Sequence, residues 1–293
     1  MAKDSRELFR VTLLGTGAPP PVMHRFGPST LVEAGEEKFL VDAGRGALQR
    51  LHQLDIPFSQ ITALLLTHHH SDHVVGIPDL WLTGWIRRPW GMRQVPLRVW
   101  GPVGTRDMMS HLAKAYEVDI RVRSRIYSPE GVATEVQDIG EGVIYENDSL
   151  KITAFEVYHG SEDLPALGFR FDFGGRSAVI SGDTTFNENL IRHSHGTDLI
   201  VHEVTGAPAE LLQSSEQLRR ITNNHTTPEQ AGEVFARVTP KLAVFTHILL
   251  FGEFAAAELI PAARKTYSRA LEVGEDLMRI EIGEDIQVIR FAP

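Results

Sequence analysis

Short apolar runs that end in polar or charged residues recur along the chain and predict buried strands. The three clearest runs cover residues 61–68, 176–184 and 241–247. A short continuous apolar run bounded by turn-forming residues is typical of a strand that is buried on both faces. We therefore expect three strands that present His68, Asp183 and His247 at their carboxyl ends.

Further strands and helices alternate with these runs. Residues 10–19 predict a strand that leads into a Gly-rich turn, and residues 29–44 predict two strands that end at Asp42. The helical spacing of apolar residues covers 45–54, 103–118, 227–238 and 253–271. Strands interleaved with helices predict an α/β fold in layers. No internal repeat or linker divides the chain, so we expect a single domain over residues 1–293.

Composition narrows the chemistry that this domain can perform. The 293 residues are 42% apolar and 23% charged, as in ordinary globular proteins, and include no cysteine. Disulfides, thiolate nucleophiles and Cys-bound zinc are therefore excluded, and any metal must be held by His and carboxylate. The first residues lack the features of a signal peptide, and no apolar run is long enough to span a membrane. We expect a cytoplasmic protein with no membrane association.

Charge is unevenly distributed along the sequence. The net charge is −9, which disfavours extensive nucleic-acid binding because affinity for polyanions comes mainly from neutralised phosphates. Residues 87–125 are nevertheless basic, with eight Arg and one Lys against three acidic residues. A solvated surface is the favoured interpretation of this stretch, and a rim that steers anions is the alternative.

Three tryptophans lie close together after the histidine-rich stretch. Trp81 and Trp85 stand four residues apart, which places them on one side of the expected helix, and Trp90 follows. Packing in the core or at a dimer interface is the favoured interpretation. The alternative is an aromatic wall above the site, which would suit a hydrophobic or aromatic substrate.

The densest set of candidate ligands follows the predicted strand 61–68. His68, His70, Asp72 and His73 form the pattern H-x-H-x-D-H. Alternate histidines in an extended turn can point the same way and hold one metal ion, while Asp72 and His73, at the start of the next helix, can reach a second. The same alternation turns His69 away. The pattern predicts a metal site.

Three more candidate ligands lie elsewhere in the chain. His159, Asp183 and His247 are each weak signals alone, because a lone histidine at a strand end is usually structural. Together with the histidine-rich stretch they complete a set for two ions. We expect one ion on His68, His70 and His159, the other on Asp72, His73 and His247, and Asp183 between them. Ligation by nitrogen and oxygen suits two Zn²⁺ ions, with Mn²⁺ or iron as alternatives.

These motifs resemble the metallo-β-lactamase-fold hydrolases over nearly the whole chain. The resemblance is carried by "LLGTGAPPP", "FLVDAG", "LLLTHHHSDHVVGIPDL", "YHG", "SGDT" and "FTH". Within that superfamily the chain is most similar to the branch of ribonuclease Z and arylsulfatase-like enzymes. This likeness comes from "VHEVTG", which contains Glu203, and "NNHTTPEQAG", which contains His225. The resemblance implies an α/β fold of four layers, an αββα sandwich, with the metal site at the edge of the two sheets.

The resemblance also implies a mechanism. Two divalent ions would lower the pKa of a shared water, so that hydroxide is available as the nucleophile near neutral pH. His225 would give the leaving group a proton, and Glu203 would orient its ring. The alternative for this pair is a helix-capping histidine and a buried glutamate. As catalytic residues we expect Asp72, Asp183, His225 and Glu203, and we expect Asp42 to bond a ligand histidine or the histidine-rich loop rather than a metal.

The substrate is less well defined by the motifs. The branch's basic P-x-K-R-N loop is replaced here by "PPVMHRFGPS", its T-H-F-S-x-R-Y element by "THILLFG", and no Gly/Pro-rich arm for transfer RNA is visible. We therefore expect hydrolysis of a small-molecule phosphodiester or related ester in preference to transfer RNA. The alternatives are a lactonase, a β-lactamase-like enzyme, an arylsulfatase or a non-catalytic metal-bound sensor. We also expect a homodimer, with the helix after Asp72 as a candidate surface.

Overall fold

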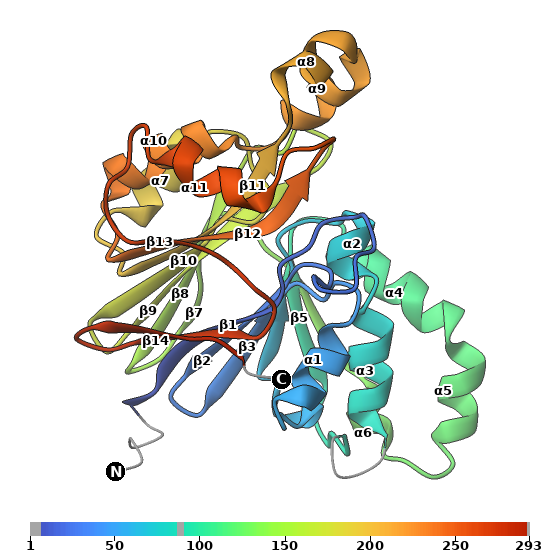
Figure 1. Ribbon diagram of the computed structural model, residues 1–293. Helices are drawn as coiled ribbons and strands as arrows, with labels where there is room; N and C mark the ends of the chain where they lie inside the picture. The colour runs from blue at the N-terminus through green and yellow to red at the C-terminus, as the bar shows by residue number, and fades with distance from the viewer. Residues whose placement is uncertain (1–6, 87–90, 292–293) are drawn as a thin grey trace.

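Two mixed β-sheets pack face to face in the computed structural model, which describes residues 7–86 and 91–291 (Figure 1). The first sheet has, in spatial order, β15 (Ile286–Ile289), β14 (Met278–Ile282), β1 (Phe9–Gly15), β2 (Ser29–Ala34), β3 (Glu37–Val41), β4 (Ala63–Leu65), β5 (Leu97–Gly101) and β6 (Thr134–Asp138). The second has β13 (Leu271–Val273), β12 (Leu242–Leu250), β11 (Leu199–Gly206), β10 (Arg176–Ile180), β9 (Ala166–Phe173), β8 (Leu150–Val157) and β7 (Gly142–Glu146).

Helices cover the outer face of each sheet (Figure 1). The first sheet is accompanied by α1 (Ala47–Gln53), η2 (Phe58–Gln60), α2 (Ser71–Val74), α3 (Ile77–Trp85), α4 (Thr105–Ala115), α5 (Glu117–Arg123) and α6 (Pro129–Val132). The second is accompanied by α7 (Glu188–Ser194), α10 (Pro228–Val238), η3 (Ala256–Glu258) and α11 (Leu259–Ala263). The short helices α8 (Ala209–Ser214) and α9 (Glu216–Thr222) project from the body beside the end of β11 (Figure 1).

Three hydrophobic layers hold the four structural layers together. The central layer joins the facing sides of the two sheets, with Val11 and Phe39 from one and Phe169 and Val244 from the other. A second layer lies between the first sheet and its helices, and a third between the second sheet and its helices. This arrangement confirms the predicted α/β fold with an αββα sandwich.

Helix α10 illustrates how the sequence forms these elements. Ala231, Val234, Phe235 and Val238 follow helical spacing and are buried against the second sheet. Thr227 caps the first turn: its side chain accepts a hydrogen bond from the Gln230 backbone N–H, and the Gln230 side chain accepts one from the Thr227 N–H. Such reciprocal bonds satisfy N–H groups that have no partner within the helix.

The tryptophans of α3 belong to the core rather than to the site. Trp81 and Trp85 are 2% and 1% exposed, and their indole N–H groups donate to the backbone carbonyls of Val132 and Ser128. The favoured interpretation as packing residues is therefore confirmed for this pair, and the aromatic wall is wrong for it. The apolar side of α3 is buried in the core, so the expectation that this helix supplies the dimer surface is wrong. Trp90 lies outside the described residues.

Two sequence expectations differ from the structure. The helix expected over residues 253–271 is much shorter, because η3 and α11 end by Ala263 and the chain enters β13 at Leu271. The strand expected to end at His247 continues to Leu250, so this histidine lies inside β12 rather than at its end. In the described ranges, no helix combines the length and apolar character that crossing a bilayer requires.

Candidate metal centre

The predicted ligands come from both sheets and meet at one edge of the sandwich. His68 and His70 lie in the loop after β4, and Asp72 and His73 lie on α2. The second sheet contributes His159 after β8, Asp183 after β10 and His247 within β12. The ligand atoms fall into overlapping groups whose members lie within 4.8 Å of one another. Loops after parallel strands meet at a common edge, which explains how residues far apart in sequence come together.

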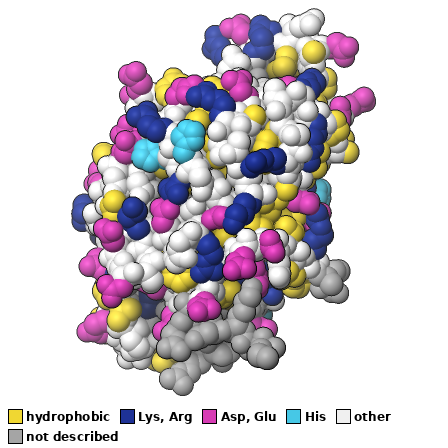
Figure 2. Space-filling model, turned by 90° about the vertical axis from the view of Figure 1, so that its left-hand side faces the viewer, with side chains coloured by type: hydrophobic (Ala, Val, Ile, Leu, Met, Phe, Trp, Pro, Cys, Tyr) yellow, Lys and Arg dark blue, Asp and Glu magenta, His cyan; other side chains and the backbone are white. Residues whose placement is uncertain are grey.

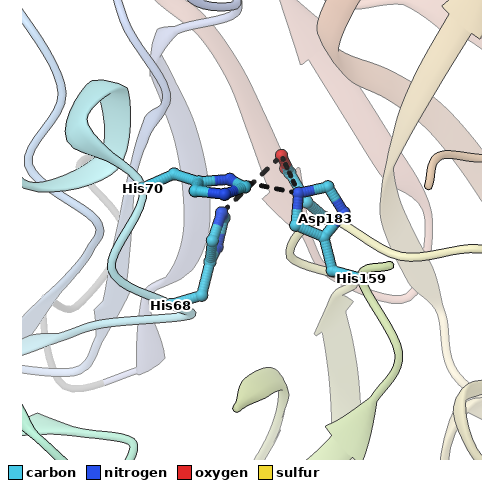
Figure 3. Close-up of side chains that lie close together, drawn as sticks. All are labelled: His68, His70, His159 and Asp183. Atoms are coloured by element: carbon cyan, nitrogen blue, oxygen red, sulfur yellow. Dashed lines mark hydrogen bonds and ion pairs between the residues drawn. The ribbon is translucent and has the colours of Figure 1, made fainter. Parts of the chain in front are cut away.

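Asp183 is the centre of the cluster. Its Oδ2 atom lies 3.9 Å from the Nε2 of His68 and 3.7 Å from the Nε2 of His159. The same oxygen lies 3.4 Å from the Nε2 of His73 and 3.2 Å from the Nε2 of His247. Figure 3 shows His68 and His70 from one loop and His159 from another converging on Asp183. One carboxylate oxygen thus faces both predicted ligand groups, as a bridging ligand must.

The second ligand group is centred on Asp72. Its Oδ2 atom lies 3.3 Å from the Nε2 of His247 and 3.7 Å from the Nε2 of His73. All three side chains are buried. The rings of His73 and His247 stack with centroids 5.2 Å apart, so their Nε2 atoms approach Asp72 and Asp183 from the same side.

Hydrogen bonds behind the rings fix which nitrogen faces the centre. His73 Nδ1 donates to Oδ2 of Asp42 at 2.7 Å, because a carboxylate can only accept. The Thr67 hydroxyl donates to the same carboxylate at 2.8 Å, so it accepts from His68 Nδ1 at 3.0 Å. Both rings therefore turn Nε2 to the centre. On His68, whose pKa burial lowers well below its ordinary value, this nitrogen is unprotonated. Burial would also lower the pKa of His73, but the charges of Asp183 and Asp42 outweigh it and raise this pKa. The expectation that Asp42 bonds a ligand histidine is confirmed, and Asp42 itself adopts a left-handed φ of 61°.

His159 is held in the same way from the second sheet. Its Nδ1 donates to the backbone carbonyl of Asn224 at 2.7 Å, which leaves Nε2 for the centre. His70 differs, because its Nδ1 is the atom that faces inward, 3.2 Å from Nε2 of His159. Two kinds of ring nitrogen therefore face the centre. His70 turns its Nδ1 inward, whereas the Asn224 carbonyl holds His159 with its Nε2 inward.

Electrostatics favour neutral imidazoles at His68 and His159 and an ionised carboxylate at Asp183. Burial lowers the pKa of His68 well below its ordinary value, and the neighbouring His73 lowers it further. Burial likewise lowers the pKa of His159. Burial would raise the pKa of Asp183, but the charges of His247 and His73 outweigh it and hold this pKa well below its usual range. Neutral imidazole and ionised carboxylate are the forms that bind metal.

Unsatisfied atoms provide a test of whether these residues fit metal ions. The Nε2 atoms of His68 and His73 are fully buried and have no hydrogen-bond partner among the described residues. A buried polar atom without a partner costs about 1–3 kcal/mol, so native structures rarely keep one without a reason. Both atoms point to the Asp183 carboxylate, where a cation would satisfy all of them at once. The donor set therefore fits metal ions.

His225 and Glu203 form a buried pair beside the ligands. His225 Nδ1 lies 3.3 Å from Glu203 Oε2, and the rings of His159 and His247 lie on either side of His225, at centroid distances of 4.7 and 5.6 Å. The other carboxylate oxygen of Glu203 accepts from the backbone N–H of Thr226 at 2.9 Å. Burial would lower the pKa of His225, but the charge of Glu203 outweighs it and raises this pKa to about 9.

A pocket of about 340 Å³ opens onto the cluster. It has a polar floor and a largely apolar wall. The floor consists of His70, Asp72, His159, Asp183, His225 and His247, and the remainder of Pro19, Pro20, Ile221, Asn224, Leu249 and Phe251. The pocket is large enough for a small organic ligand.

The remaining predicted residues and two missed ones complete the picture. His69 turns away from the centre, as expected, and its Nε2 lies 2.9 Å from the Thr105 hydroxyl. Thr67 and the Asn224 carbonyl orient the rings of His68 and His159, yet the sequence pattern indicated neither. A threonine at a strand end is unremarkable, and a backbone carbonyl leaves no signal in the side-chain pattern. Only the fold reveals them.

The fold and the clustered histidines and carboxylates define a class. Residues 37–248 match the family model of the beta-lactamase superfamily domain, and the chain belongs to this superfamily of hydrolases with the metallo-β-lactamase fold.

Particular relatives lie in its ribonuclease Z branch. The chain is 35% identical to "Ribonuclease Z" of Mycolicibacterium gilvum (strain PYR-GCK) over 282 residues, which cover 94% of this chain and 96% of the relative. Among solved structures it is similar to the metallo-beta-lactamase fold protein YhfI from Bacillus subtilis, with a TM-score of 0.71, 18% identity and coverage of 94% and 99%. The short form of human tRNase Z gives a TM-score of 0.71, 22% identity and coverage of 92% and 98%.

Proposed function

We propose that this protein is a metal-dependent hydrolase of phosphodiesters. The observation that carries the proposal is the position of Asp183, whose Oδ2 atom lies 3.2–3.9 Å from the Nε2 atoms of four histidines. Our proposed ligands are His68, His70 and His159 for one ion, Asp72, His73 and His247 for a second, and Asp183 for both. We propose Zn²⁺ for both, with Mn²⁺ or iron as alternatives, because the donors are nitrogen and oxygen only.

Particular residues of this chain support each part of the proposed mechanism. Bound ions would supply Lewis acidity and a water that loses its proton near neutral pH. Asp183 and Asp72 contribute the negative charge that holds cations in this buried place. Asp42 and Thr67 keep the ligand rings in one tautomer, so the centre does not have to reorganise when substrate arrives.

We assign the proton for the leaving group to His225. Its ring lines the pocket, and the charge of Glu203 outweighs burial and raises its pKa to about 9. A protonated imidazole can donate its Nε2 hydrogen to an ester oxygen as the bond to phosphorus breaks. Glu203 is a positioning residue, since it contacts His225 and two backbone amides rather than the pocket.

We propose a small-molecule phosphodiester as the substrate. No Lys or Arg lines the pocket within the described ranges, whereas contacts from cations supply most of the affinity for nucleic acid. On the face shown in Figure 2, basic and acidic side chains are interspersed, and the chain carries a net charge of −9. The second candidate is an RNA 3′ end, which the name of the relatives favours. A lactone, a β-lactam or a sulfate ester is a weaker alternative, as is a non-catalytic metal-bound sensor.

The test is a rate measurement on protein loaded with zinc or manganese. Bis(p-nitrophenyl) phosphate should be hydrolysed, and Asp183→Ala should lower kcat/KM by about a thousandfold or more, because the bridging carboxylate is lost. Retained folding, measured by circular dichroism, is the control. Wild-type rates in this variant would refute the assignment. A precursor transfer RNA with a 3′ trailer, assayed in parallel, separates the two candidate substrates.

We also propose a homodimer, with α5 as the surface. Val118 and Val122 lie on α5 and Ile126 lies in the turn that follows it, and they are 65%, 49% and 79% exposed. Helix α5 has an acidic first turn and a basic last turn, so antiparallel pairing with a second copy sets opposite charges together. Sedimentation should give the mass of a dimer, and Val122→Asp should give a monomer. Val143→Asp, at an exposed site on β7, should leave the mass unchanged.

A further inference from the structure

A β-bulge at His247 determines which side chains reach the pocket. In the pairing of β11 with β12, Glu203 lies opposite Thr246 and Val204 lies opposite Ile248, so His247 has no partner. Its φ of 41° is left-handed, as at an inserted residue. A bulge adds one residue to one strand and reverses the alternation of side chains beyond it.

The alternation of β12 does reverse at this position. Before the bulge, Val244 faces the central layer between the sheets, while Phe245 packs beneath the outer helices. After the bulge, Ile248 packs beneath the helices, whereas Leu249 and Phe251 line the pocket of the metal centre. The bulge therefore aims two apolar side chains at the pocket.

These side chains lie outside the three hydrophobic layers of the core. Leu249 and Phe251 meet Ile221 of α9 at the pocket, and among the described residues none of the three belongs to the hydrophobic layers of the core. Phe251 is only partly buried, although its backbone N–H is fixed to the Gly206 carbonyl at 2.9 Å. A partly buried aromatic ring beside a polar floor is a typical feature of a ligand site.

We propose that this apolar wall binds an uncharged aromatic ring carried on the phosphoryl group, and that Phe251 determines this specificity. The inference rests on the proposed function, because it places the phosphoryl group at the metal centre. An aromatic ring beside Phe251 gains from apolar burial and from ring–ring contact. A second phosphate gains little on this wall, since no Lys or Arg lines the pocket within the described ranges. The ring can belong to an aryl ester or to a nucleobase.

Binding of phosphonates tests the wall without any turnover. Phenylphosphonate and methylphosphonate carry the same charged group, and their P–C bonds resist hydrolysis. Calorimetric titration of metal-loaded wild-type protein should give about tenfold tighter binding of the phenyl compound. Phe251→Ala should bring the two dissociation constants within about twofold of each other. Phe291→Ala, which removes a phenylalanine that does not line the pocket, should keep the tenfold preference.

The possible results are separable from those of the hydrolysis assay. Equal binding of the two phosphonates by the wild type, or a preference that survives Phe251→Ala, would overturn the inference even if phosphodiesters are hydrolysed. A ring preference that depends on Phe251, in protein without hydrolytic activity, would uphold the wall and refute the proposed function. Titration with adenosine 5′-monophosphate tests whether the bound ring is a nucleobase. If the affinity for adenosine 5′-monophosphate depends on Phe251, the ring is a nucleobase. If that affinity is independent of Phe251, the ring is an aryl group. Either result agrees with an apolar wall that binds a ring.

Discussion

The pair formed by His225 and Glu203 shows how one buried contact sets the state of a residue. Both side chains are at least nine-tenths buried, and burial alone favours a neutral ring. The charge of Glu203 reverses that preference and raises the pKa of His225 to about 9. The backbone N–H groups of Thr184 and Thr226 donate to Glu203 Oε1 and hold this carboxylate in place. The protonation of His225 thus depends on one neighbour.

Removal of the Glu203 charge should therefore lower the pKa of His225 where the wild type raises it. In metal-free protein, NMR titration should give His225 a pKa near 9, and Glu203→Gln should lower it below 6.5, because only burial then acts strongly. A raised folded-state pKa stabilises the protein below pH 6.5, and this stability is lost as the pH rises through about 9. Glu188→Gln, at an exposed carboxylate paired with Arg237, is the control. An unchanged His225 pKa in Glu203→Gln would contradict this account.

At the residue scale, the sequence predicted which side chains cluster but not what orients them. The H-x-H-x-D-H spacing, His159, Asp183 and His247 account for two of the groups in the structure. His225, expected from the family resemblance, joins Asp183 and His247 in a third. Thr67 and the Asn224 carbonyl were missed, because their role arises from the distance between segments far apart in the chain. Residue types indicate chemistry, whereas the bonds behind the ligands exist only in three dimensions.

Elements connect these residues to the rest of the fold, and α10 is the one that fixes the His225 loop. The helix begins at Pro228, three residues after His225, and its capping box joins Thr227 to Gln230. The sequence predicted this helix within one residue, because its cap and its apolar spacing agree. The bulge in β12 could not be predicted in the same way, since the apolar run continues without interruption from residue 242 to 251 except at Thr246 and His247.

Loss of the α10 cap should affect stability more than chemistry. Thr227→Ala should lower the free energy of unfolding by about 1 kcal/mol, because it removes a side-chain acceptor from the first turn. Urea denaturation measures this change, and Thr227→Ser, which keeps the hydroxyl, should differ little from the wild type. A loss as small in Thr227→Ala as in Thr227→Ser would show that the cap contributes little here.

For the whole molecule, the metal centre is a connection between the two sheets. His68 and His73 follow the first sheet, whereas His159, Asp183 and His247 belong to the second. Ions bound across this edge would stabilise the folded state in which the two sheets meet, because the unfolded chain cannot assemble the same ligands. The centre is therefore expected to contribute to stability as well as to catalysis.

Removal of metal should accordingly lower the melting temperature. With free metal at about a thousand times its Kd, each ion contributes about 4 kcal/mol and the two together about 8 kcal/mol, which corresponds to roughly 13 °C for a chain of this size. Scanning calorimetry with and without a chelator measures the shift, and Asp183→Ala should show a much smaller one. An equal shift in this variant would place the stabilising ions elsewhere.

The bulge at His247 divides the end of one strand into two independent sets of positions. Ile248 and Leu250 face the outer helices and pack in the core, whereas Leu249 and Phe251 face the pocket. Substrate preference can therefore change at the pocket positions while the core stays intact, and a library randomised at 249 and 251 should yield many folded members. Deletion of a single residue at the bulge would exchange the two sets, so this short stretch of backbone is what keeps specificity and stability separately adjustable.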